Sequence, residues 1–289
     1  MLAMSRIMIA PDIKNLPPEP SGHRYIRAAV MDLDGTLLRS DKRISSFTKE
    51  ILDRVRSAGI HIIFATARPP ESALRLVASA APNAPLICSN GAVVYDPVSG
   101  RRFRTQVIRA RIVRQIVYYI RDNFPRAALA VDCAPPRPVD PRRTMDPDWP
   151  ESWGSALGDR ALWRMDMTIP PPRGVVCLMV LGAWQTHLQV PPFWRVTVTS
   201  SEHGLVEFSA LAANKLSALR WLCGQLDIPL DAVAAFGDMP NDIAVLRATG
   251  VSVAVANAHE EAKAVARYVT KSNDDDGVAH FLEELLDEV

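Results

Sequence analysis

Two short acidic clusters, far apart in the sequence, carry the residue types needed for chemistry on a phosphate group. Asp32 and Asp34 lie in the segment DLDGT, and Asp238 and Asp242 lie in the segment GDMPND. A carboxylate can attack phosphorus as a nucleophile, and carboxylate oxygens are ligands that Mg²⁺ prefers. Taken alone, DLDGT is better explained as a turn and GDMPND is ambiguous, because Asp, Asn, Gly and Pro are common turn residues.

A hydroxyl and a lysine would complete such a site. Moving a phosphoryl group requires a nucleophile, neutralisation of charge on the phosphate oxygens and a proton donor for the leaving group. Thr66 and Lys215 are suited to hold the phosphate oxygens. Taken singly, Thr66 is explained as a helix N-cap and Lys215 as a solvated surface lysine. The combination indicates phosphoryl transfer only if the fold brings these segments together.

The segments that carry these polar residues each follow a short apolar run. The pairs of run and residue are 28–31 with Asp32, 61–65 with Thr66, 85–88 with Asn90, and 232–236 with Asp238. Apolar strands that alternate with helices are typical of a parallel sheet covered on both faces. Ligands bind such sheets at the carboxyl ends of the strands. We therefore predict an α/β fold with a Rossmann-like parallel sheet that delivers these side chains to one edge.

In the middle of the chain, the alternation of apolar strands and helices is interrupted, which predicts a second domain. A helix is expected near residues 112–124, and strands are expected at 128–132, 175–182 and 194–199. We interpret residues 93–205 as an inserted α/β cap domain and residues 27–92 and 206–289 as the core. Prolines at positions 17, 18 and 20 oppose regular structure, so residues 1–26 are expected to form a loose extension.

Composition limits the classes of partner and compartment. The 289 residues are 48% hydrophobic and 22% charged, with a net charge of +1, so no general attraction to nucleic acid or anionic lipid is expected. The longest apolar run, residues 175–184, is about half of a membrane span. The four cysteines are far apart, which favours a reducing, cytoplasmic environment. Nothing in the sequence indicates the oligomeric state.

Six motifs together resemble a known family. They are DLDGTLL (32–38), ATAR (65–68), SNGA (89–92), the lysine of ANKLSAL (213–219), GDMPNDIAVL (237–246) and VANA (255–258). In order and spacing they resemble the motifs of the haloacid-dehalogenase-like (HAD) superfamily. The resemblance is greatest to its Cof-like phosphatases (subfamily IIB), whose large α/β cap is inserted after the second motif. It covers residues 28–92 and 206–289 and includes VTKSNDDDGVA (269–279).

The resemblance implies a role for each matching residue. The catalytic residues would be Asp32, Asp34, Thr66 and Lys215. The phosphate-binding residues would be Thr66, Asn90, Lys215 and Asn241. The magnesium ligands would be Asp32, Asp238 and Asp34, the last through its backbone carbonyl. Asp242 and Arg68 would support them.

The expected activity is Mg²⁺-dependent hydrolysis of a small phosphomonoester, such as a sugar phosphate, through an aspartyl-phosphate on Asp32. Asp34 would protonate the leaving group and then activate water. By family analogy, an aspartate at position 34 favours phosphatases and phosphomutases over dehalogenases and P-type ATPases. A phosphomutase and a non-catalytic metabolite-binding module remain as alternatives.

Residues near the Pro-rich segment 134–150 could select the substrate. Trp149, Trp153, Arg142 and Arg143 are the candidates, and decoration of a cap-surface loop explains them equally well.

Overall fold

The structure is a computed structural model that describes residues 8–9, 26–133, 143–145, 162–164, 174–182, 188–200 and 205–287. The chain divides into two compact units, residues 1–102 with 215–289 and residues 103–214. The divisions expected after residues 92 and 205 lie earlier in the chain. The first differs because β5 (Val93–Asp96) pairs antiparallel with β4 (Leu86–Cys88) and so continues the sheet of the first unit. The second differs because residues 205–210 form a strand in the sheet of the second unit.

The first sheet has nine strands in the order β1-β15-β14-β13-β2-β3-β4-β5-β6. Besides β4 and β5, its strands are β1 (Met8–Ile9), β2 (Ala28–Met31), β3 (His61–Ala65), β6 (Arg101–Thr105), β13 (Val233–Gly237), β14 (Val251–Ala254) and β15 (Tyr268–Val269). The run from β15 to β4 is parallel throughout. This arrangement confirms the predicted parallel α/β core. Of the expected loose extension, residues 8–9 pair with β15, and residues 1–7 and 10–25 lie outside the described part.

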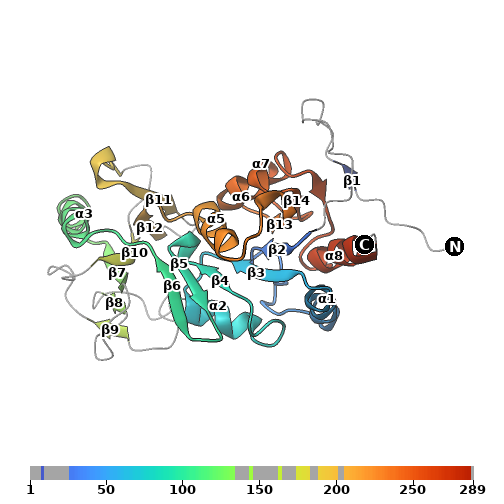
Figure 1. Cartoon of the computed structure of the whole chain (residues 1–289). Coiled ribbons are helices and arrows are strands. Elements are labelled where there is room, and N and C mark those ends of the chain that lie inside the picture. The colour runs from blue at the N-terminus through green and yellow to red at the C-terminus, as the bar shows by residue number, and fades with distance from the viewer. Residues whose placement is uncertain are drawn as a thin grey trace. The chain divides into compact units, whose positions relative to one another are not determined.

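Helices cover both faces of this sheet (Figure 1). They are α1 (Ser46–Ser57), α2 (Pro70–Val77), α5 (Lys215–Gln225), α6 (Ile243–Ala248), α7 (Glu260–Lys263) and α8 (Gly277–Asp287). The chain moves from β2 to β3 in one direction and from β13 to β14 in the other. Right-handed crossovers therefore place α1 and α6 on opposite faces. None of the helices in the described ranges is both long and apolar enough to cross a lipid bilayer.

The centre of the sheet forms the core. Every residue of β2 and of β13 is buried, and the two strands pair with Met31 opposite Phe236. Phe64 of β3, on the other side of β2, is also fully buried. Close packing of this kind leaves little freedom to the backbone. The strand ends that follow are therefore held on a rigid base.

The second unit has its own sheet, in the order β11-β12-β10-β7-β8-β9. Its strands are β7 (Ala128–Cys133), β8 (Arg143–Met145), β9 (Leu162–Arg164), β10 (Val175–Leu181), β11 (Val196–Ser200) and β12 (Leu205–Ala210). Helix α3 (Ala110–Asn123) buries Ile112, Val113, Ile116, Val117 and Ile120, at helical spacing. Among the suggested substrate selectors, Arg143 begins β8, whereas Arg142, Trp149 and Trp153 lie outside the described residues.

Candidate active site

The carboxyl edge of the first sheet gathers the predicted polar residues. Asp32 follows β2, Asp238 follows β13 and Thr66 follows β3. Because β2 lies between β13 and β3, these three positions are neighbours at one edge. The chain leaves β2 towards β3 and returns on the other side through β13, so this edge is the point where strand order reverses. In open α/β sheets, that point is where ligands bind.

A buried lysine joins two of the aspartates. Lys215, the first residue of α5, donates to Asp32 Oδ1 at 2.6 Å and to Asp242 Oδ1 at 2.7 Å. The Lys215 side chain is 1% exposed, and the side chains of Asp32 and Asp242 are 9% and 6% exposed. A long cationic side chain is almost never buried to this extent unless it is paired. The surface-lysine interpretation of Lys215 is therefore wrong.

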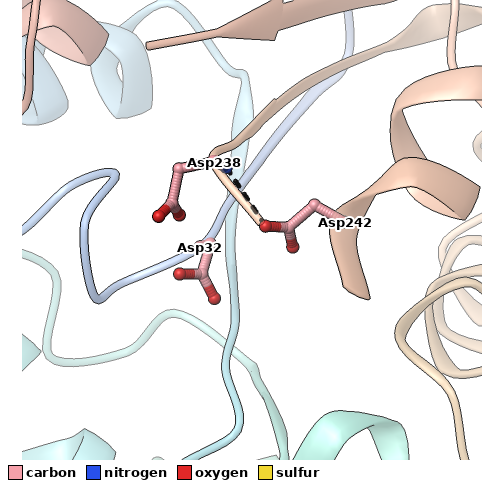
Figure 2. A group of neighbouring side chains, drawn as sticks. All are labelled: Asp32, Asp238 and Asp242. Carbon is pink, nitrogen blue, oxygen red and sulfur yellow. Dashed lines mark hydrogen bonds between the residues drawn. The ribbon is translucent and has the colours of Figure 1, made fainter. Parts of the chain in front are cut away.

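The turn after β13 fixes the second acidic cluster. Asp242 Oδ2 accepts hydrogen bonds from the backbone N–H of Asp238 at 3.2 Å and of Met239 at 3.1 Å, the first of which is drawn in Figure 2. A Cβ on Gly237 would lie 2.5 Å from Cβ of Asp242, so a side chain at position 237 would displace this turn. Asp238 is held in addition by Thr36, whose hydroxyl donates to Asp238 Oδ1 at 2.6 Å.

Burial and crowding shift the pKa values of these groups. Burial raises the pKa of Asp32 to about 8, with Asp242 and Asp238 adding to the rise and Lys215 opposing it. Burial also raises the pKa of Asp238 to about 6, although the hydrogen bond from Thr36 opposes the change. For Lys215, burial acts to lower the pKa, but the carboxylates of Asp242 and Asp32 outweigh it and raise the pKa above its usual value.

The charge of this cluster fits a divalent cation. Asp32, Asp238 and Asp242 are all buried, and each offers a carboxylate oxygen within 4.8 Å of the others (Figure 2). When all three are ionised, the carboxylates face a single ammonium group and two negative charges lack a counter-charge within the cluster. The raised pKa values of Asp32 and Asp238 reflect their burial and this crowding. Oxygen-only donors suit a hard cation. Both oxygens of Asp242 already accept hydrogen bonds, so Asp32 and Asp238 are better placed for direct ligation.

Asp34 is held by two cations on the exposed side of the site. Arg68 donates through Nε to Oδ2 at 2.6 Å and through Nη2 to Oδ1 at 2.7 Å. Lys42 donates to Oδ1 at 3.0 Å from a turn in which its own φ is +63°, an uncommon value for a residue with a side chain. Burial acts to raise the pKa of Asp34, but these hydrogen bonds and charges outweigh it and lower the pKa.

Thr66, Asn90 and Asn241 form a further connected group. The Thr66 side chain is buried, and its hydroxyl accepts from the backbone N–H of Arg68 at 3.1 Å. The backbone N–H of Asn90 donates to the Thr66 carbonyl at 3.1 Å, and Asn90 Oδ1 accepts from Asn241 Nδ2 at 3.1 Å. Asn90 has φ of +52°, which asparagine tolerates better than most residues. This turn presents the two carboxamides to each other.

A family model described as haloacid dehalogenase-like hydrolase matches residues 29–132 and 185–282. The chain belongs to this family. A phosphatase of Bacillus subtilis, YwpJ, is 28% identical to this haloacid dehalogenase-like hydrolase over 90% of this chain and 100% of its own. The pyridoxal phosphate phosphatase YbhA of Escherichia coli is 25% identical over 89% and 97%. The crystal structure of a haloacid dehalogenase-like hydrolase from Bacteroides thetaiotaomicron shares the fold, with a TM-score of 0.77 at 24% identity over 90% and 99%.

All the predicted site residues of this haloacid dehalogenase-like hydrolase lie in the first unit. The structure also adds residues to which the sequence assigned no role. Thr36 fixes Asp238, Lys42 contacts Asp34, and Asn257 donates to the carbonyl of Gly35 at 2.8 Å. Thr36 and Asn257 do fall within motifs shared with the family. Lys42 falls outside those motifs, and no pattern in the sequence indicated a role for it.

Proposed function

We propose that this haloacid dehalogenase-like hydrolase is a Mg²⁺-dependent phosphomonoester hydrolase that forms an aspartyl-phosphate on Asp32. The observation that carries the proposal is the buried Lys215 that joins Asp32 to Asp242, beside Asp238 at the carboxyl edge of the sheet. The names of two relatives, a phosphatase and a pyridoxal phosphate phosphatase, support the same reaction class.

In the first half of the reaction, a carboxylate oxygen of Asp32 attacks phosphorus and the bond from phosphorus to the leaving oxygen breaks. Lys215 lies 2.6 Å from Asp32 Oδ1, so its ammonium can also reach a phosphate oxygen bound beside that carboxylate. The Thr66 hydroxyl binds a second phosphate oxygen. These donors are preorganised by burial, and in a dry site they stabilise developing charge more strongly than water would.

Asp34 moves the protons in both halves. Its carboxyl gives a proton to the departing alcohol and then, as a carboxylate, takes one from the water that attacks the aspartyl-phosphate. Inorganic phosphate leaves and Asp32 is regenerated. Arg68 and Lys42 hold the Asp34 carboxylate in place and favour its charged form, which the second half requires. The first half requires the same carboxyl to carry a proton, so these two contacts must loosen when Asp34 acts as the acid.

Asp32, Asp238 and the backbone carbonyl of Asp34 are the groups that would hold Mg²⁺, whose charge neutralises the phosphate oxygens when it is bound. Asp242 keeps Lys215 and the turn after β13 in position, and Asn90 and Asn241 orient groups near the phosphate.

We take the substrate to be a small phosphorylated metabolite, such as a sugar phosphate. Lys215 would contact the phosphate group of such a substrate, and Asp32 and Asp238 would hold the cation beside it. The rest of the substrate would provide selectivity.

The first experiment is release of 4-nitrophenol from 4-nitrophenyl phosphate, with and without Mg²⁺, for the natural protein and for Asp32→Asn. Release that requires Mg²⁺ and falls to background in the variant is the expected result. Asp53→Asn, which alters an exposed carboxylate on α1 paired with Arg56, is the matched control and should retain full activity. Undiminished release by Asp32→Asn would refute the assignment of the nucleophile.

A further inference from the structure

Two motifs at the C-terminal end have no role in the proposed reaction. They are VANA (255–258), in the turn that follows β14, and VTKSNDDDGVA (269–279), which runs from β15 into α8. Neither contributes a side chain to the acidic cluster or to the contacts of Thr66. Both nevertheless reach the segment that begins at Asp32, which lies more than two hundred positions earlier in the chain.

Two carboxamides connect these motifs to the main chain of that segment. Asn257 Nδ2 donates to the carbonyl of Gly35 at 2.8 Å, and Asn273 Nδ2 donates to the carbonyl of Leu38 at 2.9 Å. The carboxamides are also linked to each other, because the backbone N–H of Asn273 donates to Asn257 Oδ1 at 2.9 Å. Asn273 is 7% exposed, whereas Asn257 is exposed.

The Gly35 carbonyl, which Asn257 binds, lies next to residues of the proposed metal site. The peptide after Asp34 carries the carbonyl expected to face the cation, and the next peptide carries the Gly35 carbonyl that Asn257 binds. Between these peptides, Gly35 has φ of +80°, and a Cβ on it would lie 2.4 Å from Asp238 Oδ2. One residue further on, Thr36 binds Asp238. A rotation of the Gly35 peptide would therefore move the Asp34 carbonyl and the Thr36 hydroxyl together.

From these contacts we infer that Asn257 and Asn273 are positioning residues, which fix the loop 34–38 so that the Asp34 carbonyl and Asp238 face one cation. This inference rests on the proposed function. Neither side chain touches a reacting atom. The hydrogen bond of Asn257 is exposed to water, so it adds little to stability, and its effect is on the geometry of the loop.

The test uses the full chain and the variant Asn257→Ala, with Mg²⁺ affinity measured by titration calorimetry in the absence of substrate. Loss of a group that orients a metal ligand typically lowers metal affinity or activity ~10–100-fold. We expect weakening of Mg²⁺ binding in that range and a fall in kcat, with an unchanged midpoint of urea unfolding. Asn273→Ala keeps the backbone donor to Asn257 and removes only the contact to Leu38, so it should weaken Mg²⁺ binding less.

Ser40→Ala is the matched control. It removes the hydroxyl that donates to Asp274 at 2.7 Å, an exposed contact between the same two segments that does not involve the loop carbonyls. If Asn257→Ala matches Ser40→Ala in Mg²⁺ affinity and kcat, Asn257 is only a surface contact and the inference fails. If the natural protein neither binds Mg²⁺ nor releases phosphate, the proposed function fails and the inference falls with it.

Discussion

Arg68 binds both carboxylate oxygens of Asp34, with Nε 2.6 Å from Oδ2 and Nη2 2.7 Å from Oδ1. Paired, charge-assisted hydrogen bonds of this kind fix orientation as well as charge. The proton-transfer group of the proposed mechanism is therefore held by the ATAR segment, which also contributes Thr66.

Arg68→Met should move the pH dependence of turnover. Arg68 helps to lower the pKa of Asp34, so its removal raises that pKa. In the proposed mechanism the charged form of Asp34 activates water in the second half. Where that half limits turnover, activity falls as the pH drops through the pKa of Asp34. The acidic limb of the kcat profile should therefore shift to higher pH. Lys42→Met should shift it in the same direction by less, because Lys42 makes one hydrogen bond rather than two. Profiles that coincide with the natural one would contradict this reading of Asp34.

Lys215→Met should destabilise the Mg²⁺-free protein, and more strongly at high pH. Removing one partner of a buried ion pair typically costs about 3–5 kcal/mol, because a charge is left buried without compensation. Here the cost is reduced by proton uptake, since burial already raises the pKa of Asp32 to about 8. Urea unfolding at pH 7 and pH 9 measures this, and the loss should be larger at pH 9, where Asp32 is more fully charged. An equal loss at both pH values would argue against this coupling.

Gly35→Ala should weaken the response to Mg²⁺ because the added Cβ meets Asp238 Oδ2 at 2.4 Å. Gly59→Ala is a closely matched control, since Gly59 has the same φ of +80° but no atom within 4 Å of an added Cβ. The two variants share the backbone strain and differ in the clash. We expect Gly59→Ala to keep the natural Mg²⁺ concentration for half-maximal activity and Gly35→Ala to need more. Identical Mg²⁺ curves would show that Asp238 is not displaced.

Asp276 should contribute a pH-dependent part of the stability. Burial acts to raise its pKa, but hydrogen bonds from Arg39, Ser45 and Thr48 and the charge of Arg39 outweigh burial and lower it. A lowered folded-state pKa stabilises the protein above the unfolded value, about 3.9, and this stabilisation is lost as the pH falls through the folded value.

The difference in urea midpoint between the natural protein and Asp276→Asn should therefore be full at pH 7 and narrow steadily towards pH 3. If the difference in urea midpoint stays constant over this range, the loss of stability in Asp276→Asn comes from altered packing and not from the charge of Asp276.

The sequence predicts those candidate site residues that directly follow an apolar run, because the run marks both a strand and its end. Asp32, Thr66 and Asp238 each follow an apolar run, and such a run predicts both a buried strand and the place where it ends. Helix α1 can also be predicted from the sequence, since Phe47, Ile51 and Val55 repeat at helical spacing and Gly59 follows its end.

The rest depended on contacts that local pattern does not encode. Lys42 reaches Asp34 because the turn folds back, with its N–H donating to the carbonyl of Arg39 at 2.8 Å. Strand β5 has the same apolar pattern whichever sheet it joins, so its antiparallel pairing with β4 could not be predicted. Asn257 and Asn273 find their hydrogen-bond partners, Gly35 and Leu38, only in the folded structure, because more than two hundred positions separate them in the sequence.

These contacts between the N-terminal and C-terminal segments of the first unit affect the order in which the protein folds. Asp32 and Lys215 are separated by 183 positions, and Thr36 and Asp238 by 202. Contacts between such distant positions form slowly, because closing the long intervening loop costs conformational entropy before the contact is made. During synthesis, β2 and Asp32 emerge early, and Lys215 emerges only after the whole of residues 103–214. We therefore expect the pairing of β2 with β13, and the ion pair of Asp32 with Lys215, to form late in folding.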